Sequence, residues 1–154
     1  MTEIRGKRTA LRRATDDDLD LLVAWHADPD VARYWDDETF TADEVRERLA
    51  RDDVEPYVVE EHGVPVGCLQ IHATGVDMFL VPLARGRGLG PEIARAAARH
   101  LLDGRGWTRV TVDPYHWNGS AVRSWERAGF VAVSEHDADD EHAAPWVLME
   151  FRGE

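Results

Sequence analysis

The stretch "LARGRGLGPEIARAAARHLL", residues 83–102, places three glycines and two arginines within six positions and then continues as an alanine-rich helix. Glycines at positions 86, 88 and 90 leave the backbone N–H groups unobstructed by a Cβ, and Pro91 suits the first turn of a helix. Because an apolar strand precedes this loop, the amides, the helix N-terminus and the arginines together predict a cradle for a phosphate-like anion. The alternative is a flexible glycine loop whose arginines are solvated.

Two common phosphate motifs do not account for this loop. The phosphate loop of nucleotide hydrolases needs a lysine, and the chain has only Lys7. The dinucleotide fingerprint fails because position 91 is proline and no acidic residue is well placed for a ribose. The predicted ligand therefore carries a phosphate of another kind.

Composition limits the class of protein. A chain of 154 residues with 44% apolar and 31% charged residues fits one compact domain with a core. The net charge of -12 argues against nucleic acid as a partner, although residues 84–109 carry six arginines against two acidic residues. An acidic total that only keeps the protein soluble is the alternative.

Other features of the composition concern location. One cysteine, Cys68, allows no internal disulfide, and no stretch of the chain resembles a signal peptide or a membrane span. We therefore expect a cytoplasmic protein with no membrane partner, and we assign no metal site.

The hydrophobic patterns predict a mixture of strands and helices. Helices are expected after the N-caps Thr15, Thr41 and Asn118, as a short piece ending near residues 34 and 35, and directly after the glycine loop. Strands are expected at residues 8–13, 57–61, 64–72, 76–82, 108–114, from 130 onward, and 143–151. A hairpin turn at residues 62–63 makes one pair antiparallel, while strand–helix–strand around the glycine loop makes another parallel. The fold class is α+β.

Two blocks of sequence resemble those of one superfamily. The loop matches the pattern Arg or Gln, two residues, Gly, one residue, Gly or Ala, through Arg85, Gly88 and Gly90. About thirty residues later, "NGSAVRSWERAGF" matches an Asn-x-x-Ala helix that ends in Gly-Phe. On these motifs the chain is identified as a member of the GCN5-related N-acetyltransferase (GNAT) superfamily. The resemblance implies a GNAT fold over a single domain, residues 1–154. Its sheet is mixed and mostly antiparallel, with a splayed central parallel pair and helices on both faces.

Shorter motifs resemble a subfamily. "RYW", "GCLQIH", "GVDMFL" and "VTVDPYHWN" are similar to aminoglycoside 6'-N-acetyltransferases and to relatives that acylate lysine-type amines on siderophores. The resemblance covers residues 34–130 and implies acetyl-CoA as the cofactor. It implies that Leu80 and Val81 pair their backbone with pantetheine and that Asn118 hydrogen-bonds it. The pyrophosphate would lie on Arg85, Gly86, Arg87, Gly88, Leu89 and Gly90.

Acetyl transfer to an amine requires a group that accepts a proton, since an alkylamine is mostly protonated at neutral pH. Asp77, a carboxylate within the apolar "GVDMFLV" strand, is the first candidate for this catalytic role. The alternatives are an aspartate satisfied by backbone amides and, as rival bases, His72 and His116. Trp125 occupies the position where the superfamily often has a tyrosine that protonates the thiolate, and an indole cannot supply that proton. Trp125 as core filling is the other interpretation.

The part of the site that receives the substrate amine is predicted to be acidic. Asp113 and the loop residues Asp137, Asp139, Asp140 and Glu141 would border the amine, with Asp113 and Asp140 as the substrate-binding carboxylates. Trp35 would stack a sugar ring, while Gln70 and His72 would contact the substrate. Such a rim suits a cationic small-molecule amine, because complementary charge steers it inward. A solvated acidic face is the alternative.

These observations lead to one functional hypothesis and two alternatives. The hypothesis is an acetyl-CoA-dependent N-acetyltransferase that acts by direct attack on an amine of a polycationic small molecule, with an aminoglycoside 6' amine as the expected substrate and antibiotic resistance as the expected consequence. Cys68 sits mid-strand, where packing explains it better than an acyl-enzyme does. The alternatives are acylation of a peptide, a protein N-terminus or a siderophore lysine, and an acetyl-CoA sensor without transfer. Pairing of two chains through the last strand into a homodimer is left open.

Overall fold

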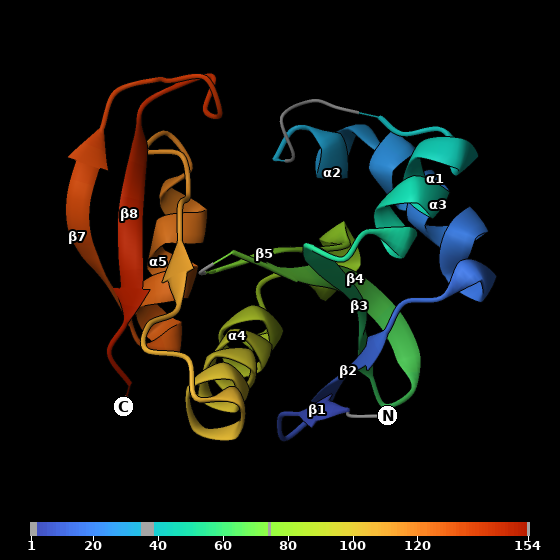
Figure 1. The fold of residues 1–154 in the computed structure, drawn as a ribbon, viewed down its shortest axis with the longest axis horizontal. Coiled ribbons are helices and arrows are strands. Elements are labelled where there is room, and N and C mark those ends of the chain that lie inside the picture. The colour runs from blue at the N-terminus through green and yellow to red at the C-terminus, as the bar shows by residue number, and fades with distance from the viewer. Residues whose placement is uncertain (1–2, 35–38, 74, 154) are drawn as a thin grey trace.

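The computed structural model describes residues 3–34, 39–73 and 75–153, which form an eight-stranded sheet in the order β1-β2-β3-β4-β5-β6-β8-β7 (Figure 1). Every neighbouring pair is antiparallel except β5 and β6. The strands are β1 (Ile4–Arg5), β2 (Thr9–Arg13), β3 (Val54–Glu61), β4 (Val64–His72), β5 (Gly75–Leu80), β6 (Thr111–Val112), β7 (Phe130–His136) and β8 (Trp146–Phe151). The predicted mixed, mostly antiparallel sheet with a central parallel pair is confirmed.

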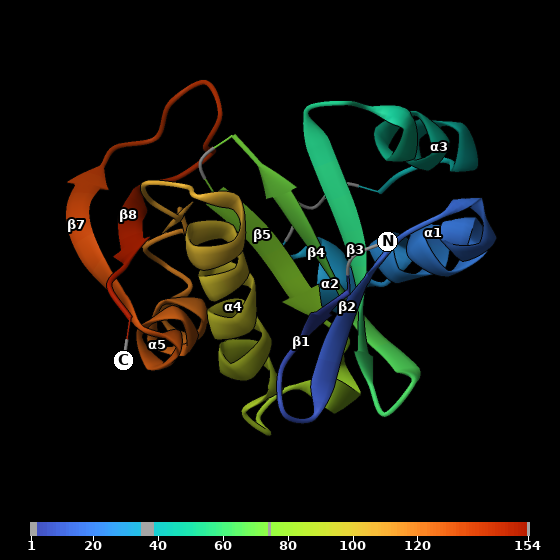
Figure 2. The same cartoon turned by 60° about the horizontal axis from the view of Figure 1, so that its bottom comes forward.

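The parallel pair is short and opens along its length. β5 and β6 pair only at Gly75 and Thr111, at the beginning of β5, while β5 continues to Leu80. Beyond that position the two strands diverge, and Figure 2 shows α4 lying between β5 and the β8–β7 pair. The sheet is therefore split into two halves that meet at one end of β5.

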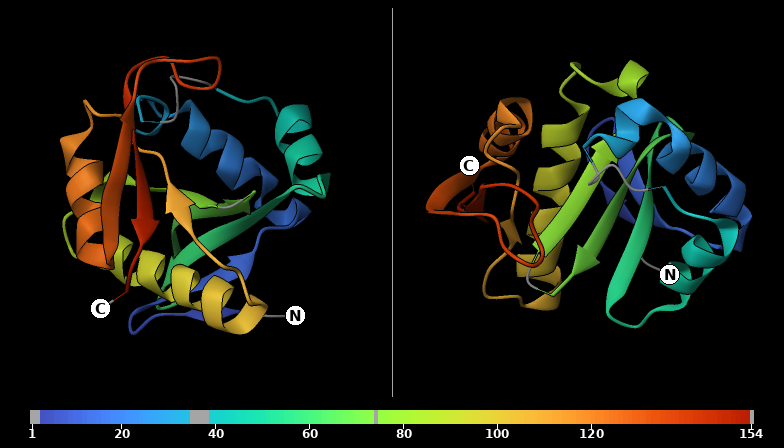
Figure 3. Two further views of the ribbon diagram at one scale, coloured as in Figure 1. Left: turned by 60° about the vertical axis from the view of Figure 1, so that its left-hand side comes forward. Right: turned by 90° about the horizontal axis from the view of Figure 1, so that it is seen from above.

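Helices cover both faces of the sheet (Figure 3). On one face, α4 (Leu89–Arg99) and α5 (Gly119–Ala128) pack over the larger core cluster, in which Leu89, Ile93 and Leu101 are fully buried. On the other face, α1 (Leu19–Ala27), α2 (Pro29–Ala32) and α3 (Ala42–Ala50) cover a smaller cluster. β5 contributes to both clusters because its side chains alternate between the two faces.

The helix ends follow the predicted capping residues. Thr41 Oγ1 accepts from the Glu44 N–H at 3.2 Å and the Glu44 carboxylate accepts from the Thr41 N–H at 2.9 Å, which is a complete capping box. Asn118 Oδ1 accepts from the Ala121 N–H at the start of α5. Gly129 ends α5 with φ of +112°, a left-handed conformation that favours glycine.

One carboxylate fastens the N-terminal strands to the helix that follows the glycine loop. Glu92, in the first turn of α4, accepts hydrogen bonds of 2.7–3.0 Å from the N–H of Arg8, the N–H and hydroxyl of Thr9, and Nε of Arg8. These bonds lower the pKa of Glu92, although its burial alone would raise it. The start of α4, directly after the glycine loop, is thus held against the beginning of β2.

Several boundaries differ from the sequence predictions. The strand expected at residues 108–114 is reduced to Thr111–Val112, since Pro114 cannot donate to a ladder and the chain turns there toward α5. β7 extends to His136 and so includes the first residues of "SEHDADDEHA" (134–143), a stretch whose lack of an apolar period predicts a loop, because strand pairing with β8 continues through polar residues at the sheet edge. A 3₁₀ turn, η1 (Asp16–Asp18), precedes α1, and a second, η2 (Pro82–Ala84), follows β5. A π-helical turn, η3 (His100–Gly104), extends α4.

Candidate active site

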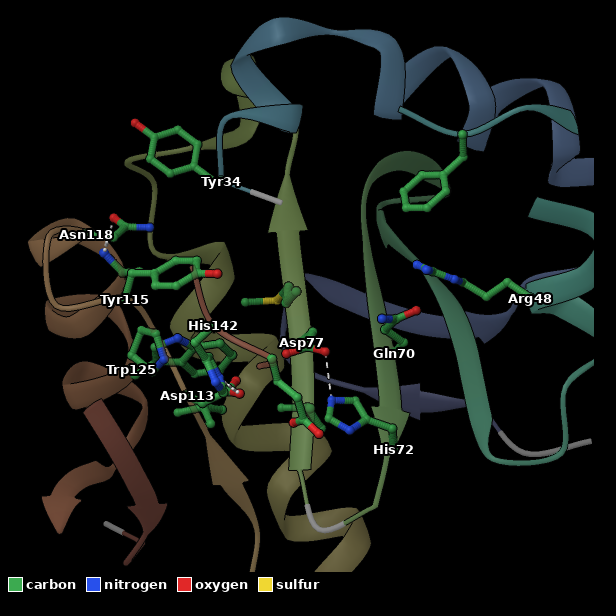
Figure 4. A pocket seen from close by; sticks show the side chains of 17 residues that line it. Tyr34, Arg48, Gln70, His72, Asp77, Asp113, Tyr115, Asn118, Trp125 and His142 are labelled. Carbon is green, nitrogen blue, oxygen red and sulfur yellow. Dashed lines mark hydrogen bonds and ion pairs between the residues drawn. The ribbon is translucent and has the colours of Figure 1, made fainter. Parts of the chain in front are cut away.

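A cavity of about 370 Å³ lies where β5 and β6 part. β4, β5, the segment after β6, α3, α5 and the loop before β8 all contribute to its wall (Figure 4). The structure brings together five of the predicted site residues there, namely Gln70, His72, Asp77, Asp113 and Asn118.

Asp77 and His72 form the centre of this cavity. Asp77 pairs with Gln70 in the β4–β5 ladder, and the side chain of Asp77 shares the face of Phe79, the face covered by α1–α3. His72 Nε2 lies 2.7 Å from Asp77 Oδ2, and each side chain is about one-third exposed. This contact raises the pKa of His72 above its ordinary value, while burial opposes the rise. Asp77 and His72 are therefore in direct contact and border the cavity together.

A second carboxylate–histidine contact lies across the opening. His142 Nε2 lies 2.7 Å from Asp113 Oδ2, and His142 Nδ1 lies 2.9 Å from Asp139 Oδ1. Burial lowers the pKa of His142, but the two carboxylates outweigh it and the pKa is raised. Burial and then the charge of Asp77 raise the pKa of Asp113. The Trp146 ring stacks on the His142 imidazole with centroids 4.1 Å apart, so the histidine that holds Asp113 is itself fixed.

The backbone at the end of β5 presents one amide toward the opening. Val81 donates its N–H to Val66 O at 2.9 Å, and its carbonyl accepts from Ala84, so both groups of Val81 have partners within the chain. The pantetheine pairing predicted for Val81 is not supported, because the β4–β5 ladder extends to this residue. Since N–H groups alternate between strand edges, the Leu80 N–H points away from β4, toward the β6 side.

The glycine loop has the backbone shape that its sequence predicts, but both arginine side chains are engaged. Gly86 and Gly88 adopt φ of +77° and +80°, which glycine tolerates without strain. Arg85 donates to the carbonyls of Leu80 and Asp30, each at 2.9 Å. Arg87 forms a bidentate ion pair with Glu61 at 2.8 and 2.9 Å. The donors that this loop leaves for an anion are therefore chiefly backbone amides and the N-terminus of α4.

These features fit a coenzyme A thioester. The N–H groups of Leu89 and Gly90 lie in the first turn of α4, where no intrahelical acceptor is available. A Cβ on Gly90 would lie 3.5 Å from Ser124 Oγ and 3.6 Å from the side chains of Leu80 and Met78. The loop thus leads directly to the β5 edge of the opening.

Asn118, the N-cap of α5, and Trp125, on α5, line the cavity from the side opposite β4. Because Asn118 Oδ1 already caps the helix, only its side-chain NH₂ remains to donate to a ligand. Trp125 is 8% exposed and packs edge-on against Phe130 with ring centroids 5.2 Å apart. It therefore fills the core and also borders the cavity.

Other predicted residues lie elsewhere. Trp35 is outside the described residues. Asp140 is exposed and does not line the cavity, whereas Glu141 beside it does. His116 does not line the cavity either and lies 3.5 Å from Glu135. Burial raises the pKa of Cys68 to about 12, which keeps the thiol protonated and agrees with its role in packing.

Arg48, Tyr115 and His142 also line the cavity but were not predicted from the sequence. His142 belongs to the acidic loop, and its position beside Asp113 depends on β8 pairing with β6, which no local pattern reveals. Arg48 lies on a polar helix face that the sequence predicts to be exposed. For His142 and Arg48, the only local signal is a basic side chain in a stretch that is otherwise rich in acidic residues.

Comparison with known proteins agrees with this site. A family model described as an acetyltransferase (GNAT) domain matches residues 14–138, and the chain belongs to this family. Acetyl-CoA is the acetyl donor of GNAT acetyltransferases. Two curated relatives, each an aminoglycoside N(6')-acetyltransferase type 1, come from Klebsiella pneumoniae and Serratia marcescens. Each is 28% identical over 145 residues, an alignment that covers 78% of this chain and 72% of the relative.

Solved structures show the same fold. AAC(6')-Ib in complex with parmomycin and acetyl-CoA superposes with a TM-score of 0.84 at 26% identity, covering 94% of this chain and 93% of that one. AAC(6')-Ib with coenzyme A and kanamycin gives a TM-score of 0.81 at 27% identity, covering 92% and 93%. A spermidine N-acetyltransferase from Vibrio cholerae, solved with CoA and spermine, shares the fold with a TM-score of 0.81 at 16% identity, covering 94% and 95%.

Proposed function

We propose that this GNAT acetyltransferase transfers the acetyl group of acetyl-CoA to a primary amine of a polycationic small molecule, with the 6' amine of an aminoglycoside as the substrate. The observation that carries the proposal is the placement of Asp77 and His72 on one wall of the cavity and Asp113 and Glu141 on the other. Three carboxylates around one opening attract an ammonium group and hold it for deprotonation.

The geometry supports a role for each of these residues. The thioester supplies an activated acetyl group when the cofactor is bound. Asp77, coupled to His72, accepts the proton that the amine must lose before it attacks. Asp113, held by His142, orients the amine or a second ammonium group of the same substrate. The outward N–H of Leu80 is the donor that we assign to the thioester carbonyl, a role typically worth about 3 kcal/mol in acyl transfer.

The remaining assignments complete the proposal. Leu80, the amides of residues 86–90 and the Asn118 side-chain amide hold the cofactor, Arg85, whose N–H donates to Pro82 O, supports the loop, and Gln70 contacts the substrate. The chain acts as a single N-acetyltransferase domain, and the acetyl group moves without an acyl-enzyme, because the Cys68 thiol stays protonated. We place the enzyme in the cytoplasm, where acetyl-CoA is made, and propose antibiotic resistance as the consequence of its activity.

The test is release of free thiol from acetyl-CoA in the presence of kanamycin, with spermidine and a lysine peptide as competing classes of amine. We expect saturable release with kanamycin at a higher kcat/KM than with the other two. Thiol release with the lysine peptide alone would show that the substrate is a peptide amine and not an aminoglycoside. Tight acetyl-CoA binding without release for any amine would show that the protein senses the cofactor.

A further inference from the structure

One cationic side chain in the cavity has no part in the chemistry described above. Arg48 projects from α3 into the cavity wall, and its guanidinium carbon lies 4.6 Å from the centroid of the Phe40 ring. Figure 4 shows the guanidinium extending from the α3 side toward the Gln70 amide. Stacking on the aromatic ring fixes the plane of the guanidinium and leaves its N–H groups directed at the cavity edge.

The guanidinium of Arg48 differs from those of its neighbours along the chain. Arg46 forms an ion pair with Asp43 at 2.7 Å, and Arg51 forms one with Asp53 at 2.7 Å. Within residues 3–34, 39–73 and 75–153, no carboxylate lies within 4.0 Å of the Arg48 guanidinium. The positive charge of Arg48 is therefore not neutralised by a described residue, although the chain as a whole is strongly acidic.

Gln70 adds a second donor beside Arg48. Gln70 is 9% exposed, and it lies directly opposite Asp77 in the β4–β5 ladder. Gln70 and Arg48 also border, with Phe40, a small neighbouring pocket under α3, so the two side chains lie close together. The cavity is thus divided by charge: carboxylates lie along β5, the segment after β6 and the loop before β8, and cationic and amide donors lie against α3.

We propose that Arg48 and Gln70 form a subsite that binds oxygen acceptors, and that the preferred substrates are primary amines that carry an oxygen group, such as the hydroxyls of an aminoglycoside or a carboxylate, where a linear polyamine carries a second ammonium group. The reacting amine would lie at Asp77 and the oxygen group at Arg48, which binds such oxygens through paired N–H donors. A linear polyamine would bring a second ammonium group against the guanidinium and would be disfavoured. This proposal rests on the N-acetyl transfer proposed above and refines its substrate class.

Two probes of equal backbone length isolate this effect. ε-Aminocaproate carries a carboxylate at the end distant from its amine, and hexamethylenediamine carries an ammonium group there. We expect the wild-type protein to favour ε-aminocaproate in kcat/KM by about tenfold, the effect of one charge-assisted contact. Arg48→Gln should reduce that ratio to near one with kcat for ε-aminocaproate nearly unchanged. The matched control, Arg46→Gln on the same helix, should keep the wild-type ratio.

Binding measurements make the outcome independent of turnover. Calorimetric titration of both probes into the protein saturated with coenzyme A should show the same preference and its loss in Arg48→Gln. A wild-type preference for the diamine, or a ratio that Arg48→Gln leaves unchanged in a folded protein, would overturn the proposal. Absence of thiol release with kanamycin would count against the proposed aminoglycoside function and would leave the discrimination between the two probes intact.

Discussion

Replacing Gly75 by alanine perturbs the position where the two halves of the sheet meet. Gly75 is the β5 residue that pairs with β6, opposite Thr111. A Cβ at Gly75 would overlap the Thr111 carbonyl oxygen and would lie 3.0 Å from Thr111 Oγ1. The carbonyl belongs to the backbone of β6 and cannot rotate away as a side chain could. The added methyl group must therefore push β5 and β6 apart.

The size of the effect follows from overpacking. Forcing a methyl group into a packed site costs about 1–3 kcal/mol, and the rigid backbone contact places this substitution near the upper end. For a protein of this size, 1 kcal/mol shifts the melting temperature by about 2–4 °C, so Gly75→Ala should lower it by about 6–12 °C. Because β6 leads into Asp113, the KM for the amine should rise as well.

Scanning calorimetry and steady-state thiol release measure the two consequences. Gly90→Ala is a suitable stability control, because its Cβ would make an ordinary contact of 3.5 Å with Ser124 Oγ and alanine favours a helix. Gly90→Ala should melt at or slightly above the wild-type temperature. If Gly75→Ala melted like the wild type, the close approach of β5 and β6 at this position would be refuted.

Three further substitutions test other parts of the account. Asp77→Asn should lower kcat/KM about 10²–10⁴-fold with the KM for acetyl-CoA unchanged, whereas Asp53→Asn, at an exposed position, should retain wild-type rates; equal activity of the two variants would exclude catalysis by Asp77. Burial, with a smaller contribution from the Arg48 charge, lowers the pKa of His26 from 6.5 to about 4. The folded state therefore resists a proton that the unfolded chain binds. Stability from this residue is present above pH 6.5 and falls by about 2 kcal/mol between pH 7 and pH 5, and urea unfolding of His26→Gln should lack this part of the pH dependence. Glu92→Gln removes the charge that four donors from Arg8 and Thr9 share, and should lower the free energy of unfolding by about 2 kcal/mol; an unchanged urea midpoint would contradict that role.

Much of the fold could be predicted because its signals are local. The capping box at Thr41, the Asn118 cap and Gly129 each depend on a few neighbouring residues, and the structure has all three as predicted. The glycine loop is local as well, and Gly86 and Gly88 adopt the left-handed conformation that favours glycine. Strand ends were less predictable, since the extent of β7 depends on its partner β8 more than on its own polarity.

The site was only partly predictable for the same reason. Asp77 stands out as a carboxylate in an apolar strand. Its neighbours Gln70 and His72 lie on β4, which precedes β5 in the chain and pairs with it in antiparallel fashion. His142 lies 29 residues from Asp113, and the two meet only because β8 pairs with β6. The engagement of Arg87 by Glu61, likewise, depends on where the β3–β4 turn comes to lie. Tertiary neighbours of this kind leave no periodic signal in the sequence.

No helix among the described residues is long and apolar enough to cross a membrane. The reaction that we propose needs only the cavity, the glycine loop and a diffusible amine, so the cavity and the loop can both be tested with the purified chain.

A crystal structure of the protein with coenzyme A and kanamycin tests the central claim most directly. The account predicts the pyrophosphate on the amides of residues 86–90 and the 6' amine within hydrogen-bond distance of an Asp77 carboxylate oxygen, on the face of β5 covered by α1–α3. An amine bound at another carboxylate, with Asp77 facing only His72, would contradict it.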